Sequence, residues 1–180
     1  MEGKRLGLLR ELAPNANLIA VLLNPNNPFY DAQRKDLEEA SRTLGIKLHM
    51  ERASNESEIA SAFKAVEQVH AGALLVGADI FFFGRRELVV DAAAKLRVPA
   101  IYEWRQYSEA GGLMSYGTSL AESCKQAGNY AARILKGENP GGLPVMQASK
   151  FELVLNLKTA RQLGIDVPPA FSARADDIIE

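Results

Sequence analysis

Short strand-like segments alternate with helical patterns over the first hundred residues, and this alternation constrains the fold more than any other feature. The expected strands lie at 18–23, 46–51, 73–76 and 98–102. Strands that alternate with helices predict a parallel sheet with right-handed crossover connections. Because LIAVLL and GALLVG are apolar almost throughout, we expect helices on both faces of that sheet. The sequence therefore predicts an α/β fold in which helices flank a parallel sheet in three layers.

Three helices are expected between these strands. The first, over 29–44, carries apolar residues at helical spacing among charged ones, so one face of it should cover the sheet. The second is expected over 56–68, where Ser54 and Ser57 are both plausible N-terminal caps. The third is expected over 85–96.

The chain divides into three expected domains. Residues 1–17 form a short amphipathic crossover helix that ends at Pro14. Residues 18–111 form the α/β lobe, which we expect to bind a ligand. Residues 112–180 form a hinge and a return segment, with longer loops and glycine breaks.

The segment 112–180 has too few elements to bury a core of its own. It offers strands at 113–116 and 151–156 and one long helix over 119–135. These strands either extend the sheet of the first lobe, or belong to a lobe mostly absent from this chain, or are completed by a second copy. Strands without partners pair with other chains, so we expect a homodimer through this C-terminal block.

The composition excludes several classes of protein. The chain has 180 residues and a formal net charge of -1, and its basic residues are scattered, so no nucleic-acid partner is expected. Cys124 is the single cysteine, which excludes an intramolecular disulfide, and its helical context predicts a buried position. No apolar run reaches the roughly 20 residues that span a bilayer. The first residues also lack the pattern of a signal peptide.

No residue pattern indicates catalysis. A phospho-receiver domain would place acids after the first strand, where this chain has Asn and Pro. A dinucleotide-binding fold would need G-x-G-x-x-G at the same place. His49 and His70 lie far apart without ligand spacing around them, which argues against a metal site. We therefore predict a protein that is not an enzyme and that uses no cofactor.

Polar side chains follow the first strand, in the loop that carries Asn24, Asn26 and Asn27. In doubly wound sheets, ligands gather beyond the carboxyl ends of the strands. Amide side chains and the free N–H groups of the next helix attract anionic groups such as a carboxylate. This loop therefore predicts a site for a polar small molecule.

The third and fourth strands end in a similar way. Asp79 follows the third strand and precedes the three phenylalanines of 81–83, and an acid beside aromatic rings suits an ammonium group on an apolar body. Alternatively, Asp79 caps the next helix and the phenylalanines belong to the core. The fourth strand end carries Tyr102, Glu103 and Trp104, which suit a zwitterionic or aromatic ligand, or form an ordinary amphipathic hinge helix.

The order of motifs along the whole chain resembles one family. KRLGLLRELAP is followed by VLLNPNNP, then by GALLVGADIFFFGRRELVVDAAAKLRVPAIYEWRQYSEAGGLMSYG, and then by ILKGENPGGLPVMQASKFELVLNLKTARQLGIDVP. This series resembles the substrate-binding proteins of ABC transporters of the tryptophan/tyrosine transport type, which are similar to type I periplasmic binding proteins. The resemblance implies two α/β lobes that close on a ligand at a hinge.

The resemblance also implies site residues and partners. By this resemblance, the residues of this chain that would face the cleft are Asn24, Asn26, Asn27, Asp79, Tyr102, Ser115, Tyr116 and Gly117. The implied ligand is a small amino-acid-like molecule, with an aromatic or branched amino acid as the implied class, and the implied partner of the complete protein is the membrane permease of an ABC transporter. The implied location is periplasmic or extracellular, as a lipoprotein, although a chain without a signal peptide would be cytoplasmic as written.

One departure from the family concerns the first lobe. A family member would carry a signal peptide and most of one lobe before KRLGLLREL. We therefore expect this chain to contain one whole lobe and only an incomplete part of the other, as an expressed fragment or a truncated gene product. The alternative function is an effector-sensing domain of a transcription regulator, which uses the same fold. An upstream helix-turn-helix would favour that alternative.

Overall fold

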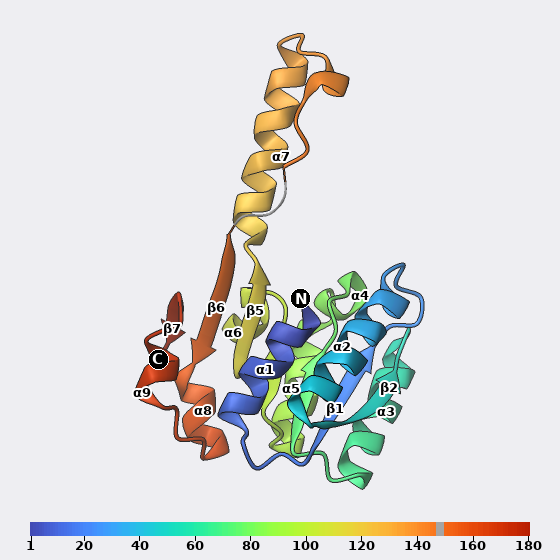
Figure 1. The fold of residues 1–180 in the computed structure, drawn as a ribbon, viewed down its shortest axis with the longest axis vertical. Coiled ribbons are helices and arrows are strands. Elements are labelled where there is room, and N and C mark those ends of the chain that lie inside the picture. Colours follow the sequence, from blue (N-terminus) through green and yellow to red (C-terminus); the bar gives the residue numbers. More distant parts are fainter. Residues whose placement is uncertain (147–149) are drawn as a thin grey trace.

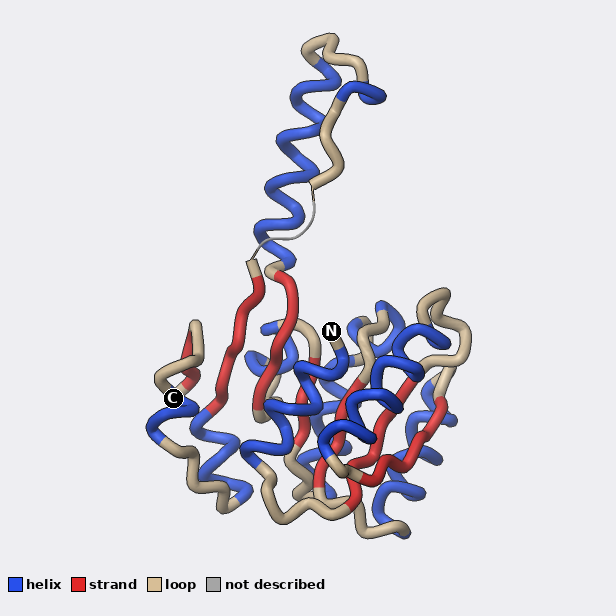
Figure 2. The backbone as a smooth tube through the Cα atoms, in the orientation of Figure 1, coloured by secondary structure: helices blue, strands red, loops and turns tan. Residues whose placement is uncertain are grey.

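A single seven-stranded sheet organises the molecule. The computed structural model describes residues 1–146 and 150–180. The strand order is β2-β1-β3-β4-β5-β6-β7, and all neighbours are parallel except β5 and β6 (Figures 1 and 2). The strands are β1 (Leu18–Leu23), β2 (Lys47–Arg52), β3 (Ala73–Val76), β4 (Ala100–Tyr102), β5 (Met114–Thr118), β6 (Phe151–Asn156) and β7 (Asp177–Ile179). The prediction of an α/β fold with a mostly parallel sheet is confirmed.

Helices cover both faces of the sheet (Figure 2). The helices are α1 (Glu2–Leu12), α2 (Tyr30–Leu44), α3 (Glu56–Gln68), α4 (Ile80–Phe83), α5 (Arg86–Leu96), α6 (Arg105–Glu109), α7 (Leu120–Leu135), α8 (Leu157–Leu163) and α9 (Pro169–Ser172). The cap predicted for α3 is wrong, because Asn55 accepts the Glu58 N–H at 2.9 Å. Ser54 instead donates its backbone N–H and hydroxyl to the Glu58 carboxylate.

The core has two halves, one on each face of the sheet. Along β1, Ile19 and Val21 join the half covered by α1 and α2, whereas Ala20 and Leu22 join the half covered by α3 and α5. This alternation follows from the two-residue period of a strand. It also explains why β1 is apolar at every position. Burying one such aliphatic side chain contributes about 1.5–3 kcal/mol.

The strands of residues 112–180 extend the sheet formed by residues 18–111. β5 pairs with β4 on one side and with β6 on the other, and β6 also pairs with β7. Both strands therefore have partners within the chain, and the reason given for a homodimer, unpaired strands, is wrong. The sheet continues across residue 112, where the predicted domain boundary lies. The division into domains stays a prediction.

Helix α7 extends away from the sheet, whereas the other long helices lie along it (Figure 1). None of its residues is buried, and Leu135 near its end is 88% exposed. Cys124 on this helix is exposed, so the prediction that it is buried is wrong. The helical pattern was read correctly, but the pattern does not say whether a partner element covers the apolar side.

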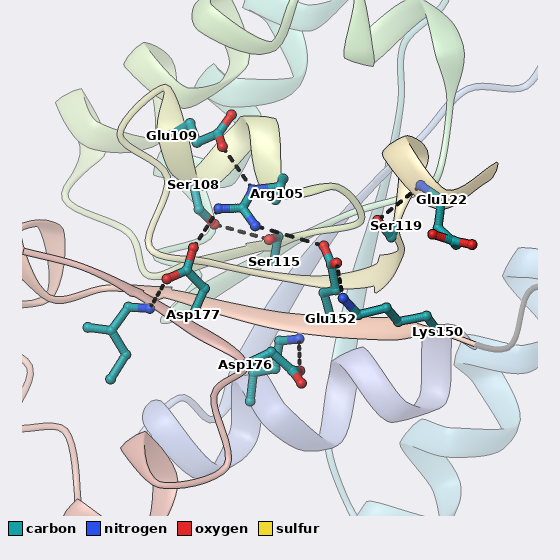
Figure 3. Close-up of polar contacts among 12 residues, drawn as sticks. Arg105, Ser108, Glu109, Ser115, Ser119, Glu122, Lys150, Glu152, Asp176 and Asp177 are labelled. Carbon is teal, nitrogen blue, oxygen red and sulfur yellow. Dashed lines mark hydrogen bonds and ion pairs between the residues drawn. The ribbon is translucent and has the colours of Figure 1, made fainter. Parts of the chain in front are cut away.

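Ion pairs and hydrogen bonds tie α6 to the last three strands (Figure 3). Arg105 on α6 contacts Glu109 at 2.8 Å and Asp177 on β7 at 2.5 Å. Underneath, the Ser108 hydroxyl donates to Ser115 on β5 at 3.2 Å. These contacts hold α6, which follows β4, against β5 and β7. In the part of the chain that the structure describes, no helix is both long and apolar enough to cross a membrane.

Candidate ligand-binding site

A cavity of about 550 Å³ lies at the carboxyl ends of β1, β3 and β4. Its lining comes from the loop after β1, the start of α4, the two residues after β4 and the first turn of α1. The chain's first residue lies beside α4 at this edge (Figure 1). The carboxyl edge of a parallel sheet is where ligands of doubly wound proteins bind. A cavity of this size suits a small molecule.

One wall of the cavity is a hydrogen-bonded network centred on Asp79. Its Oδ1 accepts from the Asn24 amide at 3.1 Å and from the backbone N–H groups of Phe81 and Phe82 at 2.9 and 3.1 Å. Its Oδ2 accepts from the Asn27 amide at 2.8 Å. Asp79 therefore caps α4, as in the alternative interpretation, and it also holds the loop after β1.

The amide oxygens of the same loop are also occupied within the chain. Asn24 Oδ1 accepts the Asn26 N–H at 2.9 Å, and Asn27 Oδ1 accepts the Phe29 N–H at 2.8 Å. Such Asx turns fix the loop without help from a ligand. The predicted residues Asn24, Asn26, Asn27 and Asp79 are thus brought together, and all four line the cavity. Their contact with a ligand stays a prediction.

Another part of the lining carries charged side chains with unpaired polar atoms. Arg5 is fully buried and donates from Nη2 to Glu2, which is also buried. Among the described residues, Nε and Nη1 of Arg5, one oxygen each of Glu2 and Glu103, and Nε1 of Trp104 have no hydrogen-bond partner. Unpaired buried polar atoms are rare, and each calls for an explanation such as a missing ligand or water. This part of the lining is the Arg5 cluster: Glu2, Arg5, Glu103 and Trp104.

Burial dominates the electrostatics of the Arg5 cluster. It raises the pKa of the Glu103 carboxyl, which the positive charge of Arg5 opposes and the negative charge of Glu2 reinforces. Burial also raises the pKa of the Glu2 carboxyl, against the attraction of Arg5. The charged form of each acid is therefore penalised in the folded protein. The cluster holds two carboxyl groups for one guanidinium.

Apolar side chains surround these polar walls. Phe29 is 69% exposed and Ile80 is 76% exposed, and both line the cavity. The Arg85 guanidinium lies 4.3 Å from the ring centre of Phe81, a cation–π contact. The Trp104 ring meets Phe83 edge to face at 4.9 Å. The cavity thus joins a charged floor, the Arg5 cluster, to an aromatic rim that includes Phe29 and Phe81, which suits a ligand with a polar end and an apolar body.

Two of the predicted site residues lie in the protein interior. Tyr102 is buried and stacks on Tyr107 with ring centres 4.6 Å apart, and burial raises the pKa of its hydroxyl. One edge of Tyr102 borders a separate hollow of about 230 Å³ between α5 and α8. Ser115 is buried against Ser108. Neither Tyr102 nor Ser115 lines the cavity.

Two others lie on β5 outside the cavity lining. Tyr116 stacks near Phe151 with ring centres 6.2 Å apart. Gly117 lies against the backbone and side chain of Glu103, where a Cβ would come within 2.7 Å of the Glu103 Cγ. Gly117 is therefore needed for close approach of β5 to the residue after β4. Ligand contacts by these four residues stay a prediction.

The sequence interpretation missed the contribution of the first helix. Glu2 and Arg5 were not singled out, yet both line the cavity. A signal was present, because Glu2, Arg5, Leu9 and Leu12 follow the three- and four-residue spacing of one helix face. Charged residues on an otherwise apolar face indicate a buried polar site. Glu103 and Trp104 were noted at the end of the fourth strand, and the structure places both in the lining.

A mostly parallel sheet with a cavity at its carboxyl edge is an arrangement found in α/β ligand-binding proteins. The chain belongs to the ABC transporter substrate binding protein family, whose profile matches residues 2–179. No curated protein matches the sequence significantly.

Solved structures show the same fold. A conserved domain protein from Vibrio cholerae has 29% identity and a TM-score of 0.88 over 98% of this chain and 60% of its own. An ABC domain from Streptococcus pneumonia, solved with L-Trp, has 23% identity and a TM-score of 0.88 over 99% of this chain and 60% of its own. A LacI family transcriptional regulator from Bifidobacterium animalis has 15% identity and a TM-score of 0.62 over 85% of this chain and 59% of its own. The chain thus spans about 60% of the length of these structures.

Proposed function

We propose that this chain acts in solute binding for an ABC-type uptake transporter and holds an amino-acid-like ligand at the carboxyl edge of its sheet. The observation that carries the proposal is the cavity of about 550 Å³ with a charged floor and an aromatic rim. The floor provides unpaired donors and acceptors, and the rim provides rings for an apolar side chain. A free amino acid has both kinds of group. The proposal needs no nucleophile, metal or cofactor, so the role is that of a receptor and not of an enzyme.

The comparisons support the ligand class. The structure from Streptococcus pneumonia contains L-Trp, and its fold superposes on nearly all of this chain. An aromatic amino acid is therefore the first ligand to test. In the complete protein, a second lobe would close over the cavity, and the closed form would deliver the ligand to a membrane permease. We place that protein on the outer side of the cytoplasmic membrane, in line with the family.

Isothermal titration calorimetry against a panel of the natural amino acids tests this proposal. The chain should bind at least one aromatic or branched amino acid. Ala78 lines the cavity, so Ala78→Phe should fill it and weaken that binding by at least about tenfold, the effect of roughly 1.4 kcal/mol. Ala60 lies exposed on α3, and Ala60→Phe is the matched control, which should bind like the unaltered chain. Equal binding by both variants would contradict the cavity as the site.

The likeness to a LacI family regulator keeps an effector-sensing role as the second candidate. The fold does not separate the two roles, because both use a hinged α/β lobe. The family match favours transport. Binding of nucleosides or sugars in a second calorimetric panel, with no binding in the amino-acid panel, would favour the regulator.

A further inference from the structure

Glu103 offers a carboxylate at the cavity that no side chain of the described residues pairs, whereas Glu2 is paired with Arg5 through one oxygen. It directly follows β4, lines the cavity and makes no hydrogen bond or ion pair with any described residue. We propose that Glu103 binds a cationic group of the ligand, a primary ammonium, and so selects ligands that carry one. This inference rests on the proposed solute-binding function and assigns a residue to the recognition of one ligand group.

Asp79 does not fill this role, because its carboxylate is already occupied. Four N–H donors from Asn24, Asn27, Phe81 and Phe82 reach its two oxygens. An ammonium at Asp79 would have to displace a helix cap and the two amides that shape the loop. The same ammonium at Glu103 displaces no protein donor. The expectation from the sequence that Asp79 holds an ammonium is therefore transferred to Glu103.

The charge balance of the Arg5 cluster favours a cation. Glu2 and Glu103 provide two acids, and Arg5 provides one positive charge, which its hydrogen bond directs to Glu2. Met1 also lines the cavity, but its amino group is paired with Asp36 at 2.8 Å. A bound ammonium would compensate the remaining acid, since opposite charges close together favour the charged form of each. Trp104 lines the same cavity, and an aromatic face attracts a cation by a further cation–π interaction.

The position of Glu103 is fixed by its neighbours. Its backbone and the start of its side chain lie against Gly117 of β5, where no side chain intervenes. On the same stretch, Trp104 packs against Phe83. A residue held on both sides loses little freedom when a ligand binds, so its charge is preorganised for recognition.

Three related probes separate the contribution of the ammonium from that of the rest of the ligand. L-tryptophan carries an ammonium and a carboxylate, tryptamine only the ammonium, and indole-3-propionic acid only the carboxylate. Each is titrated into the unaltered chain, into Glu103→Gln and into the control Glu39→Gln. Glu39 lies exposed on α2 outside the cavity and loses the same charge.

We expect Glu103→Gln to weaken L-tryptophan and tryptamine by about 10- to 100-fold, the loss of one charge-assisted hydrogen bond. Binding of indole-3-propionic acid should not weaken, and Glu39→Gln should match the unaltered chain. Glu103→Asp, which keeps the charge, should retain the preference for tryptamine over indole-3-propionic acid. Thermal unfolding of each variant confirms that it is folded, which we expect because Glu103 makes no hydrogen bond with a described residue.

The other outcomes are distinguishable. Amino-acid binding that Glu103→Gln leaves unchanged, or weakens equally for all three probes, overturns the role of Glu103 and leaves the solute-binding proposal standing. Binding of tryptamine that depends on Glu103, with no binding of any amino acid, supports the residue assignment and overturns the proposed ligand class. Failure of all three probes to bind the unaltered chain overturns the role of Glu103, and the solute-binding proposal falls with it only if no amino acid of the full panel binds.

Discussion

Asp79 should stabilise the fold even without a ligand, and its replacement by alanine provides a quantitative test. The side chain is buried, and its two oxygens accept four hydrogen bonds. Asp79→Ala removes the cap of α4, which costs about 1 kcal/mol. It also leaves the buried Asn24 amide without an acceptor, at about 1–3 kcal/mol. The Asn27 amide keeps a second acceptor in the Ala78 carbonyl, so its loss is smaller.

These costs sum to about 3 kcal/mol of lost unfolding free energy. For a chain of this length, that corresponds to a fall in Tm of roughly 6–12 °C. Asp79→Asn should cost less, about 1–2 kcal/mol, because its oxygen can still accept from Phe81 and Phe82 while its amide nitrogen faces the Asn27 amide. Stability should therefore fall in the order unaltered chain, Asp79→Asn, Asp79→Ala.

Urea denaturation followed by far-UV circular dichroism measures these differences at one pH. Asp91→Ala is the matched control, since Asp91 lies exposed on α5 and should change stability by less than about 0.5 kcal/mol. If Asp79→Ala were as stable as Asp91→Ala, the network around Asp79 would contribute nothing, and the assignment of Asp79 as a structural residue would be refuted.

Three further predictions concern the core, the Arg5 cluster and the contacts of α6. Phe82→Ala should cost about 3–5 kcal/mol in urea denaturation, because Phe82 is fully buried, and a cost below about 1 kcal/mol would contradict its core position. Burial raises the pKa of Glu103 in the folded state, so the unaltered chain should lose stability relative to Glu103→Gln as pH rises from acidic to neutral; a constant difference would contradict this. Arg105→Gln should lower the free energy of unfolding by less than about 1 kcal/mol, yet it should speed amide hydrogen exchange at 178–179. Unchanged exchange would show that the ion pair between Arg105 and Asp177 does not hold β7 in place.

Much of the fold could be predicted because local patterns and the global arrangement agree. The strand over 151–156 was placed correctly, since FELVLN is a mostly apolar run of strand length. β7 was missed because DII is short and follows a proline-rich tail. It forms only through pairing with β6, a contact between distant parts of the chain. Sequence periodicity carries no information on such pairings.

The site was only partly predictable for a related reason. The sequence places Asn24 and Asp79 at strand ends, and topology brings strand ends together, so their proximity followed. Whether a polar group is already occupied depends on distances that a pattern does not give. Asp79 is therefore satisfied within the chain, whereas Glu103 is not. The inward direction of Tyr102 likewise follows from the strand alternation, which places it in the core between β4 and α6.

The central claim is that an amino acid binds at the carboxyl edge of the sheet, between the loop after β1 and the residues after β4. Titration of the ¹⁵N-labelled chain with the tightest-binding amino acid, followed by amide chemical shifts, tests it most directly. The account predicts the largest shifts at 24–29, 78–81 and 103–104, and none along the exposed helix α7. Saturating shifts confined to the hollow between α5 and α8, or no shifts with any amino acid, would contradict it.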